Sequence, residues 1–256
     1  MSILSDLASF YLAFEGEKGK IGLSSCGKPI FYFKVSYTSK PTIIIQYSIH
    51  AREYITTYLA LEQIKQYQEF GRFGTVYFIP MLNPDGVKIA LTEDDKYKAN
   101  ARGVDLNVNF DAKWGSGKQN TKIKGSENYI GEKPFSECET KALRDFTLDI
   151  LPDITISYHS KGEEIYYSFF QDKEALKRDK KIAKMLARIT GYKIRDLKGS
   201  AGGYKDWCIE KLKIPALTIE VGSDKLSHPI KKEHLHKIFK KNKRVIKVIT
   251  EEVKWN

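Results

Sequence analysis

His50 and Glu53 are the residues of this sequence whose types and spacing most clearly suggest chemistry. They stand three positions apart, where an apolar run over residues 42–49 gives way to a helix-like pattern. A neutral imidazole nitrogen and a carboxylate oxygen both suit Zn²⁺, and at a strand-to-helix junction the two can reach one cation from the same side. Two ligands do not hold a catalytic metal, so a third must come from elsewhere while a fourth position stays open for water.

His159 is the natural third ligand, because it follows another apolar strand pattern at residues 153–158. Functional sites in open α/β sheets collect at the carboxyl ends of strands, so His50 and His159 could meet at one edge. A plainer interpretation stays open for each of them. A lone His-x-x-Glu pattern is a weak signal, and either imidazole could be a core or capping residue.

Glu220 is a carboxylate near the end of a third apolar strand pattern, residues 216–221. Burying a carboxylate in such a run is costly unless the group is paired or used. Beside a zinc-bound water, Glu220 could take the proton of that water and pass it to a leaving amine. The alternative is that Glu220 pairs with a buried lysine or arginine.

The spacing of apolar residues predicts the elements that must position these groups. Helices are expected over residues 2–14, 54–70, 136–148, 173–190, 204–212 and 231–253. Strands are expected over residues 21–24, 30–35, 42–49, 75–81, 153–158, 163–170 and 216–221. Ser136 and Glu139 have the spacing of a capping box, and residues 83–133 read as a long functional loop region.

Strands that alternate with helices predict an α/β fold, a single-domain α/β/α sandwich with a central mixed, mostly parallel twisted sheet. The chain has 256 residues, enough to bury a full core, and an α/β fold of this size is often one domain. No internal repeat or linker divides the sequence, so we expect one domain over residues 1–256.

The net charge of +11 invites a nucleic-acid hypothesis, but the lysines are spread over expected helix faces at residues 173–184 and 231–247. No nucleic-acid module is recognisable, so we expect no nucleic-acid partner. A basic surface would also attract acidic peptides, and we favour that partner class.

Apolar runs, the N-terminal residues and the cysteines bear on where in the cell the protein is located. No apolar run reaches the roughly 18 residues of a membrane span, and residues 1–6 lack the basic and apolar regions of a signal peptide. Cys26, Cys138 and Cys208 are too widely spaced for a zinc knuckle, and their odd number gives no disulfide framework. We therefore expect a cytoplasmic protein without a pro-domain, and the sequence leaves its oligomeric state open.

The motifs along the chain resemble those of the zinc metallocarboxypeptidases of the carboxypeptidase A type. The similar segments, in the order of that family, are residues 50–53, 83–86, 103–110, 157–160, 202–207 and 218–220. The resemblance implies that His50, Glu53 and His159 bind one Zn²⁺ per chain and that Glu220 is the general base and acid. It therefore implies a zinc metallopeptidase and a zinc peptidase catalytic domain.

Two further residues gain roles from the same resemblance. Arg102 looks like the arginine that polarises the scissile carbonyl and stabilises the oxyanion, a role that suits a fixed guanidinium. Its alternative is a solvated loop arginine. Asp105 looks like the carboxylate that orients the first zinc-binding histidine.

The sequence departs from the family at the substrate end of the site. Val108 stands where the family has an arginine that grips the terminal carboxylate of the substrate, and a valine cannot do so. Asn107 remains as a donor. Lys198 falls at the place of a mobile tyrosine, and Tyr204 lies near without aligning cleanly. We expect Asn107, Ser160, Lys198, Tyr204 and Lys205 to contact substrate.

Residues 158–166 and 202–207 look most like bacterial γ-D-glutamyl–diaminopimelate peptidases, which cleave cell-wall stem peptides. Lys161, Lys198 and Lys205 are candidate partners for the carboxylates of such substrates, although each can also be an ordinary surface lysine. Two other functions stay open: a general carboxypeptidase acting on unmodified peptides, and a non-catalytic zinc- or peptide-binding protein that has kept the pocket.

Overall fold

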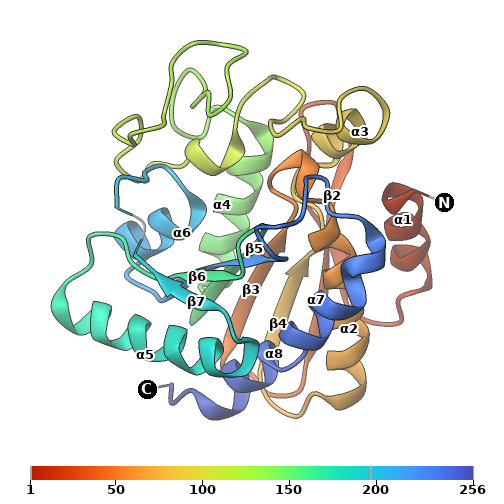
Figure 1. Cartoon of the computed structure of the whole chain (residues 1–256). Helices are drawn as coiled ribbons and strands as arrows, with labels where there is room; N and C mark the ends of the chain where they lie inside the picture. Colours follow the sequence, from red (N-terminus) through yellow and green to blue (C-terminus); the bar gives the residue numbers. More distant parts are fainter. Residues whose placement is uncertain (1, 197, 256) are drawn as a thin grey trace.

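One eight-stranded sheet forms the centre of the protein in a computed structural model that describes residues 2–196 and 198–255 (Figure 1). Its strand order is β1-β2-β4-β3-β5-β8-β6-β7. The strands are β1 (Lys18–Leu23), β2 (Pro29–Ser36), β3 (Thr42–Tyr47), β4 (Thr75–Ile79), β5 (Ile154–Ser160), β6 (Glu164–Tyr166), β7 (Lys193–Arg195) and β8 (Ala216–Val221). The central neighbours β4, β3, β5 and β8 run parallel. The pairs β1–β2, β2–β4 and β6–β8 are antiparallel, so the sheet is mixed as predicted.

Helices and short helical turns connect and cover the strands. The α-helices are α1 (Ile3–Ala13), α2 (Ile55–Phe70), α3 (Pro84–Thr92), α4 (Cys138–Ile150), α5 (Lys173–Thr190), α6 (Tyr204–Trp207), α7 (Leu235–Asn242) and α8 (Val245–Lys247). Turns of 3₁₀ helix lie at Ala51–Glu53, Leu106–Val108 and Lys232–His234, and π-helical turns at Cys208–Leu212 and Val248–Glu252.

The two faces of the sheet are buried under different helices, as an α/β/α sandwich requires (Figure 1). Side chains alternate along a strand, so Ile43 and Ile45 of β3 face one apolar cluster while Ile44 faces the other. α1, α2, α5, α7 and α8 cover the first face, and α4 and α6 cover the second. This arrangement confirms the predicted fold class.

Several expected boundaries are corrected by the structure. The strand expected over residues 163–170 is limited to β6, and β7 was not anticipated because its pairing supports only a short, charged segment. α3 interrupts the expected loop region. The sequence did carry a signal for α3: Asn83 caps it by accepting a hydrogen bond from the Gly86 amide, and a proline follows the cap.

The expected capping box at Ser136 does not form. Glu137 is the residue before α4, and Glu139 instead accepts hydrogen bonds from the amide and hydroxyl of Ser25 at 3.0 and 2.9 Å. A tertiary contact has therefore taken the carboxylate that would close the box.

The helix expected over residues 231–253 is broken after Asn242. The Asn242 carbonyl accepts a hydrogen bond from Gln63 Nε2 at 3.3 Å, and its side-chain amide donates to the Tyr192 hydroxyl at 2.8 Å. Contacts to α2 and to the segment after α5 thus compete with helix continuity at this buried residue. Among the described residues, no helix combines the length and apolar character needed to cross a membrane.

Candidate active site

The chain makes a tight turn directly after β3, and this turn carries two of the predicted ligands. Ser48 adopts a left-handed φ of 48°, and His50 then precedes the 3₁₀ turn Ala51–Glu53. The Thr56 hydroxyl holds the turn by accepting the Ser48 N–H at 2.9 Å and donating to the Glu53 carbonyl at 2.8 Å. His50 and Glu53 are thereby fixed at the carboxyl end of β3.

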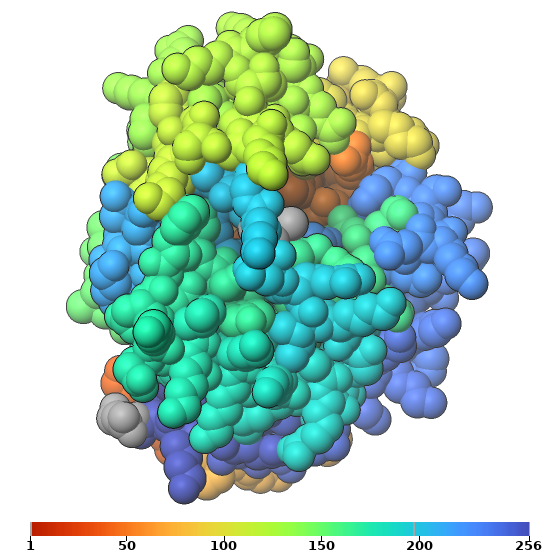
Figure 2. Space-filling view, turned by 60° about the vertical axis from the view of Figure 1, so that its left-hand side comes forward, coloured from red at the N-terminus to blue at the C-terminus, as the bar shows by residue number. Residues whose placement is uncertain are grey.

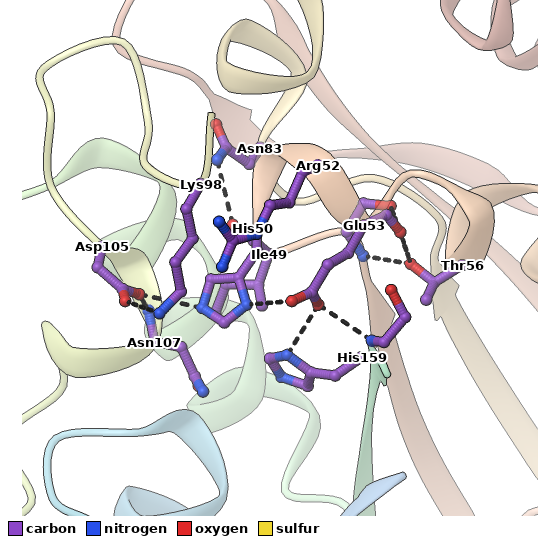
Figure 3. A network of polar contacts seen from close by, with 12 residues as sticks. Ile49, His50, Arg52, Glu53, Thr56, Asn83, Lys98, Asp105, Asn107 and His159 are labelled. Atoms are coloured by element: carbon purple, nitrogen blue, oxygen red, sulfur yellow. Dashed lines mark hydrogen bonds and ion pairs between the residues drawn. The ribbon is translucent and has the colours of Figure 1, made fainter. Parts of the chain in front are cut away.

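The third ligand, His159, comes from β5, the parallel neighbour of β3, and lies against the same carboxylate (Figure 3). Glu53 Oε1 is 2.8 Å from His50 Nδ1, and Glu53 Oε2 is 3.1 Å from His159 Nδ1. One ligand atom from each of the three residues lies within 4.8 Å of the others. Two imidazole nitrogens and a carboxylate oxygen in this arrangement could bind one zinc ion.

Asp105 fixes the orientation of the first imidazole. Its Oδ1 lies 3.1 Å from His50 Nε2 and accepts a hydrogen bond from the Asn107 amide at 2.9 Å. A proton held on Nε2 by this carboxylate leaves the Nδ1 lone pair for a metal. The ammonium of Lys98 lies 2.8 Å from the other carboxylate oxygen, so a buried network continues outward from His50 (Figure 3).

The charges around the triad act differently on its two histidines. Burial lowers the pKa of His50, but the carboxylates of Glu53 and Asp105 outweigh it and raise that pKa to about 9. For His159, burial prevails over the attraction of Glu53, and the pKa falls below its usual value. Metal binding requires both imidazoles to be neutral, so protons compete with a metal mainly at His50.

Glu220 stands next to the triad on β8, and its Oε2 is buried without a hydrogen-bond partner in the described part of the chain. Burial, reinforced by the nearby carboxylates of Glu53 and Glu164, raises the pKa of Glu220. A buried carboxylate oxygen without a partner costs free energy unless something in the site uses it. The sequence analysis left open that Glu220 pairs with a buried lysine or arginine. No lysine or arginine among the described residues bonds to Glu220.

A cavity of about 370 Å³ opens beside these residues and includes His50, Asp105 and Glu220 in its wall. Figure 2 shows the hollow, with the yellow-green segment of residues near 115 above it and the cyan segment of residues near 200 below. A cavity of about 520 Å³ between α5 and the C-terminal segment is larger. Chemistry still favours the smaller one, because His50 of the possible metal-binding group and the carboxylate of Glu220 line it.

The structure places most of the expected substrate contacts at this cavity. Asn107, Lys198 and Lys205 line it, as does Val108. Lys205 is buried and bonds to Asp206 and to the Ser168 carbonyl. Ser160 is buried beside His159, and its amide donates to Glu53 Oε2 at 3.2 Å.

Two expected site residues lie elsewhere. Arg102 is not in the cavity wall: its side chain is 55% exposed, and its Nε lies 3.3 Å from Glu137. Tyr204 is completely buried in the apolar layer under α6, where its hydroxyl bonds to Thr147 at 2.8 Å. It has no surface to offer a substrate, which corrects the expectation for this residue.

The sequence interpretation missed Lys98, which lines the cavity and joins the network of Asp105. Its signal was faint, since a single lysine in a loop has no periodicity that would show where its ammonium points. Lys161, another expected carboxylate partner, donates to the Asp224 carbonyl at 2.7 Å.

An α/β/α sandwich with a His-Glu-His triad at the carboxyl ends of its parallel strands is a scaffold for metal-dependent hydrolysis. A family model described as zinc carboxypeptidase matches residues 16–245. The chain therefore belongs to the zinc carboxypeptidase family.

The chain is similar to curated proteins from a bacterium and from an animal. It is 28% identical over 267 residues to gamma-D-glutamyl-L-diamino acid endopeptidase 1 of Lysinibacillus sphaericus, covering 89% of this chain and 66% of that protein. It is 31% identical over 172 residues to carboxypeptidase B of Helicoverpa zea, covering 57% of this chain and 39% of that protein. The chain thus spans two thirds or less of the length of these relatives.

Solved structures show the same fold at low sequence identity. Bovine thrombin-activatable fibrinolysis inhibitor, in complex with tick carboxypeptidase inhibitor, matches with a TM-score of 0.84 at 23% identity, over 98% of this chain and 94% of that one. The murein-tripeptide amidase of Escherichia coli O157 matches with a TM-score of 0.67 at 22% identity, over 95% and 94%.

Proposed function

We propose that this protein is a zinc-dependent peptidase that hydrolyses amide bonds. One observation carries the proposal: a His-Glu-His triad with ligand atoms within 4.8 Å of one another adjoins Glu220, whose Oε2 is buried and lacks a hydrogen-bond partner among the described residues. A metal site alone would suit a storage or structural role. A metal site beside an unused acid, open to a cavity, suits hydrolysis.

Each residue has a distinct part in this proposal. Zinc, when bound by His50, Glu53 and His159, would lower the pKa of a bound water and polarise a carbonyl oxygen. Glu220 takes a proton from the attacking water and later gives it to the departing nitrogen. Asp105 keeps the His50 ring in the orientation and tautomer that present Nδ1.

We further propose that the substrate is an anionic cell-wall peptide, cleaved at a γ-D-glutamyl–diaminopimelate or related bond. The relative from Lysinibacillus sphaericus, named as an endopeptidase of γ-D-glutamyl-L-diamino acids, supports this class. The cavity adds a physical reason, because its wall includes Lys118, Lys198 and Lys205. Lys118 and Lys198 form no ion pair with described residues, which leaves their charges to a ligand.

A general carboxypeptidase is the second candidate, favoured by the similarity to carboxypeptidase B. Val108 argues against a general carboxypeptidase, because this residue lines the cavity and has no charge to pair with a terminal carboxylate. The absence of a charge at Val108 is also compatible with a protein that binds peptides without cleaving them.

The experiment that separates these candidates is digestion with a mass readout. The zinc-loaded protein is incubated with purified muropeptides and, separately, with ordinary peptides carrying free C-termini, each with and without chelator. We expect chelator-sensitive cleavage of muropeptides. Preferential release of C-terminal residues from ordinary peptides would favour the general carboxypeptidase, and cleavage of neither set by zinc-loaded protein would overturn the proposed activity.

A further inference from the structure

The net charge of the protein is concentrated on two segments that lie side by side. Residues 173–190 and 231–255 contain 16 of the 43 basic side chains but only 5 of the 32 acidic ones, so they carry the whole net charge of +11. The rest of the chain has 27 side chains of each sign and is neutral. α5 packs against α7, α8 and the π-helical turn Val248–Glu252, which joins the two segments into one basic surface. In Figure 2 the teal residues of α5 lie on the surface, above the dark blue C-terminal residues.

Most lysines of this basic surface have no acidic partner. Of its 13 lysines, only Lys232, Lys241 and Lys247 form an ion pair with a described residue. The other ten are exposed. Like charges that gather on one surface repel one another and destabilise the compact state, so a partner of negative charge would relieve a real cost.

The cavity of about 520 Å³ described above is a groove in this surface, where α5 meets the C-terminal residues. Its wall contains both apolar and cationic side chains, among them Met185, Trp255, Lys177, Lys181 and Lys254. A groove of this composition fits a partner that presents negative charge beside apolar material.

The acidic side chains of the groove do not cancel its positive charge. Asp153 is paired with Lys40 at 2.9 Å, and Glu252 lies 3.7 Å from Arg244. Glu174 is the one other acid in the wall. The unpaired lysines therefore leave the groove with an excess of positive charge.

The groove lies at the opposite end of the sheet from the metal site. Pro152 and Pro215 line it and stand just before β5 and β8, whose carboxyl ends carry His159 and Glu220. Figure 1 shows the C-terminus at the lower end of the molecule, next to α5. A partner bound at this end would leave the catalytic cavity open.

Exposed apolar side chains lie at the same end of the parallel strands. Phe73 stands just before β4 and is 51% exposed, and Leu151 stands just before β5, next to the groove, and is 66% exposed. Single exposed apolar residues are ordinary, but several of them beside a basic groove indicate a surface for a protein or a membrane.

We propose that this end of the protein binds the surface of a membrane that contains anionic phospholipids. The lysines attract the phosphate headgroups, while Phe73, Leu151 and Trp255 enter the interface between headgroups and acyl chains. An indole ring is suited to that depth. A nucleic acid would use the charge alone and would leave the apolar part of the groove without a function. The proposal does not depend on the peptidase activity.

The test measures sedimentation of the whole chain with vesicles of phosphatidylcholine, either pure or with about 30% phosphatidylglycerol. One variant replaces Lys177, Lys181 and Lys254 with glutamine. We expect wild-type protein to bind only the anionic vesicles, more weakly as salt is added, and this variant to bind them at least about tenfold more weakly.

The matched control replaces Lys88, Lys124 and Lys133 with glutamine. These lysines are exposed, form no ion pair with a described residue and lie on α3 and in the loop between α3 and α4. The change in net charge is the same, so the control variant should bind anionic vesicles within about threefold of the wild type.

The apolar contacts are tested by Phe73→Ser combined with Leu151→Asn. Asparagine tolerates the left-handed φ of 49° at residue 151. We expect this variant to bind anionic vesicles about two- to tenfold more weakly. Ile123→Ser, at a position 69% exposed in the loop between α3 and α4, should not change binding.

Trp255 reports where the protein touches the membrane. Brominated lipid quenches an indole that enters the interface, so quenching by anionic brominated vesicles should be lost in Trp255→Phe. This measurement and the comparison of lipid compositions need no charge variant, so they decide the proposal even where such a variant fails to fold.

Three results would overturn the proposal. The first is wild-type protein that does not bind anionic vesicles at low salt. The second is an equal loss of binding in the two triple-lysine variants, which would show that only the total charge matters. The third is wild-type protein that binds a DNA or RNA duplex through Lys177, Lys181 and Lys254 but does not bind vesicles, which would make a nucleic acid the partner.

Discussion

His159 on β5 and Glu220 on β8 are direct partners in the register of two adjacent parallel strands. Parallel neighbours at the same level present their side chains to the same face, so a predicted metal ligand and a predicted general base lie side by side. The sheet itself therefore sets the separation between this metal ligand and the base.

We predict that Glu220→Gln keeps zinc and loses about 100- to 10,000-fold in kcat, the usual contribution of a general acid–base. The amide has nearly the same shape as the carboxylate but cannot take a proton from water. Zinc analysis and steady-state kinetics on one preparation measure both effects. The control is Glu69→Gln, an exposed change on α2. Turnover of Glu220→Gln within a few-fold of the wild type would remove Glu220 from the mechanism.

We predict that His159→Ala lowers the affinity for zinc by at least about 100-fold, because one of three protein ligands is lost. The measurement is a competition titration against a chelator of known affinity. His236→Ala, at an exposed position on α7, should bind zinc like the wild type. Unchanged zinc affinity in His159→Ala would mean that the metal, if bound, uses other residues.

Asp85 gives a prediction about stability and pH. Burial raises its pKa, but hydrogen bonds from Ser24 and from the Cys26 amide, with the charge of Lys28, outweigh burial and lower it. A lowered pKa in the folded protein means that the carboxylate stabilises the fold above its unfolded pKa of about 3.9 and that this is lost as pH falls through the folded pKa.

Asp85→Asn should therefore reduce the free energy of unfolding by about 1–3 kcal/mol at neutral pH, and the difference from the wild type should shrink as the solution is acidified below about pH 4. Denaturant unfolding of both proteins, from neutral pH to below about pH 4, measures this difference in the free energy of unfolding. A difference that stays constant or grows on acidification would show that the ionised carboxylate is not what stabilises this contact.

Lys198 provides a test of the preference for anionic substrates. It lines the cavity, is exposed and has no ion pair with described residues. We predict that Lys198→Met raises KM two- to tenfold for an anionic muropeptide at low salt, with little change for an uncharged peptide of equal length. The effect should fade as salt is added. Equal changes for both peptides would assign Lys198 a role unrelated to charge.

The metal triad could be predicted from the sequence for a geometric reason. His50 and His159 each follow an apolar run, and parallel strands deliver their carboxyl ends to a common edge. At these positions the strand pattern therefore predicts both which residues are ligands and towards which edge of the sheet they lie. The six short motifs in family order added the roles of these residues, which periodicity alone does not supply.

The side-chain positions of the loop residues could not be predicted from the sequence in the same way. Arg102 and Lys98 lie in a segment without regular structure, where the sequence does not fix side-chain direction, and the expectation favoured the arginine. Tyr204 begins α6, and only the packing of that helix under the sheet shows that its ring is in the core. Contacts between distant segments decide such positions.

The zinc site formed by His50, Glu53 and His159 is tested most directly by anomalous scattering at the zinc absorption edge from crystals of the wild-type protein grown with zinc. We predict a single strong peak within bonding distance of His50 Nδ1, His159 Nδ1 and a carboxylate oxygen of Glu53, and no such peak in crystals of His159→Ala. A wild-type crystal with zinc freely supplied and no peak among these three side chains would contradict it.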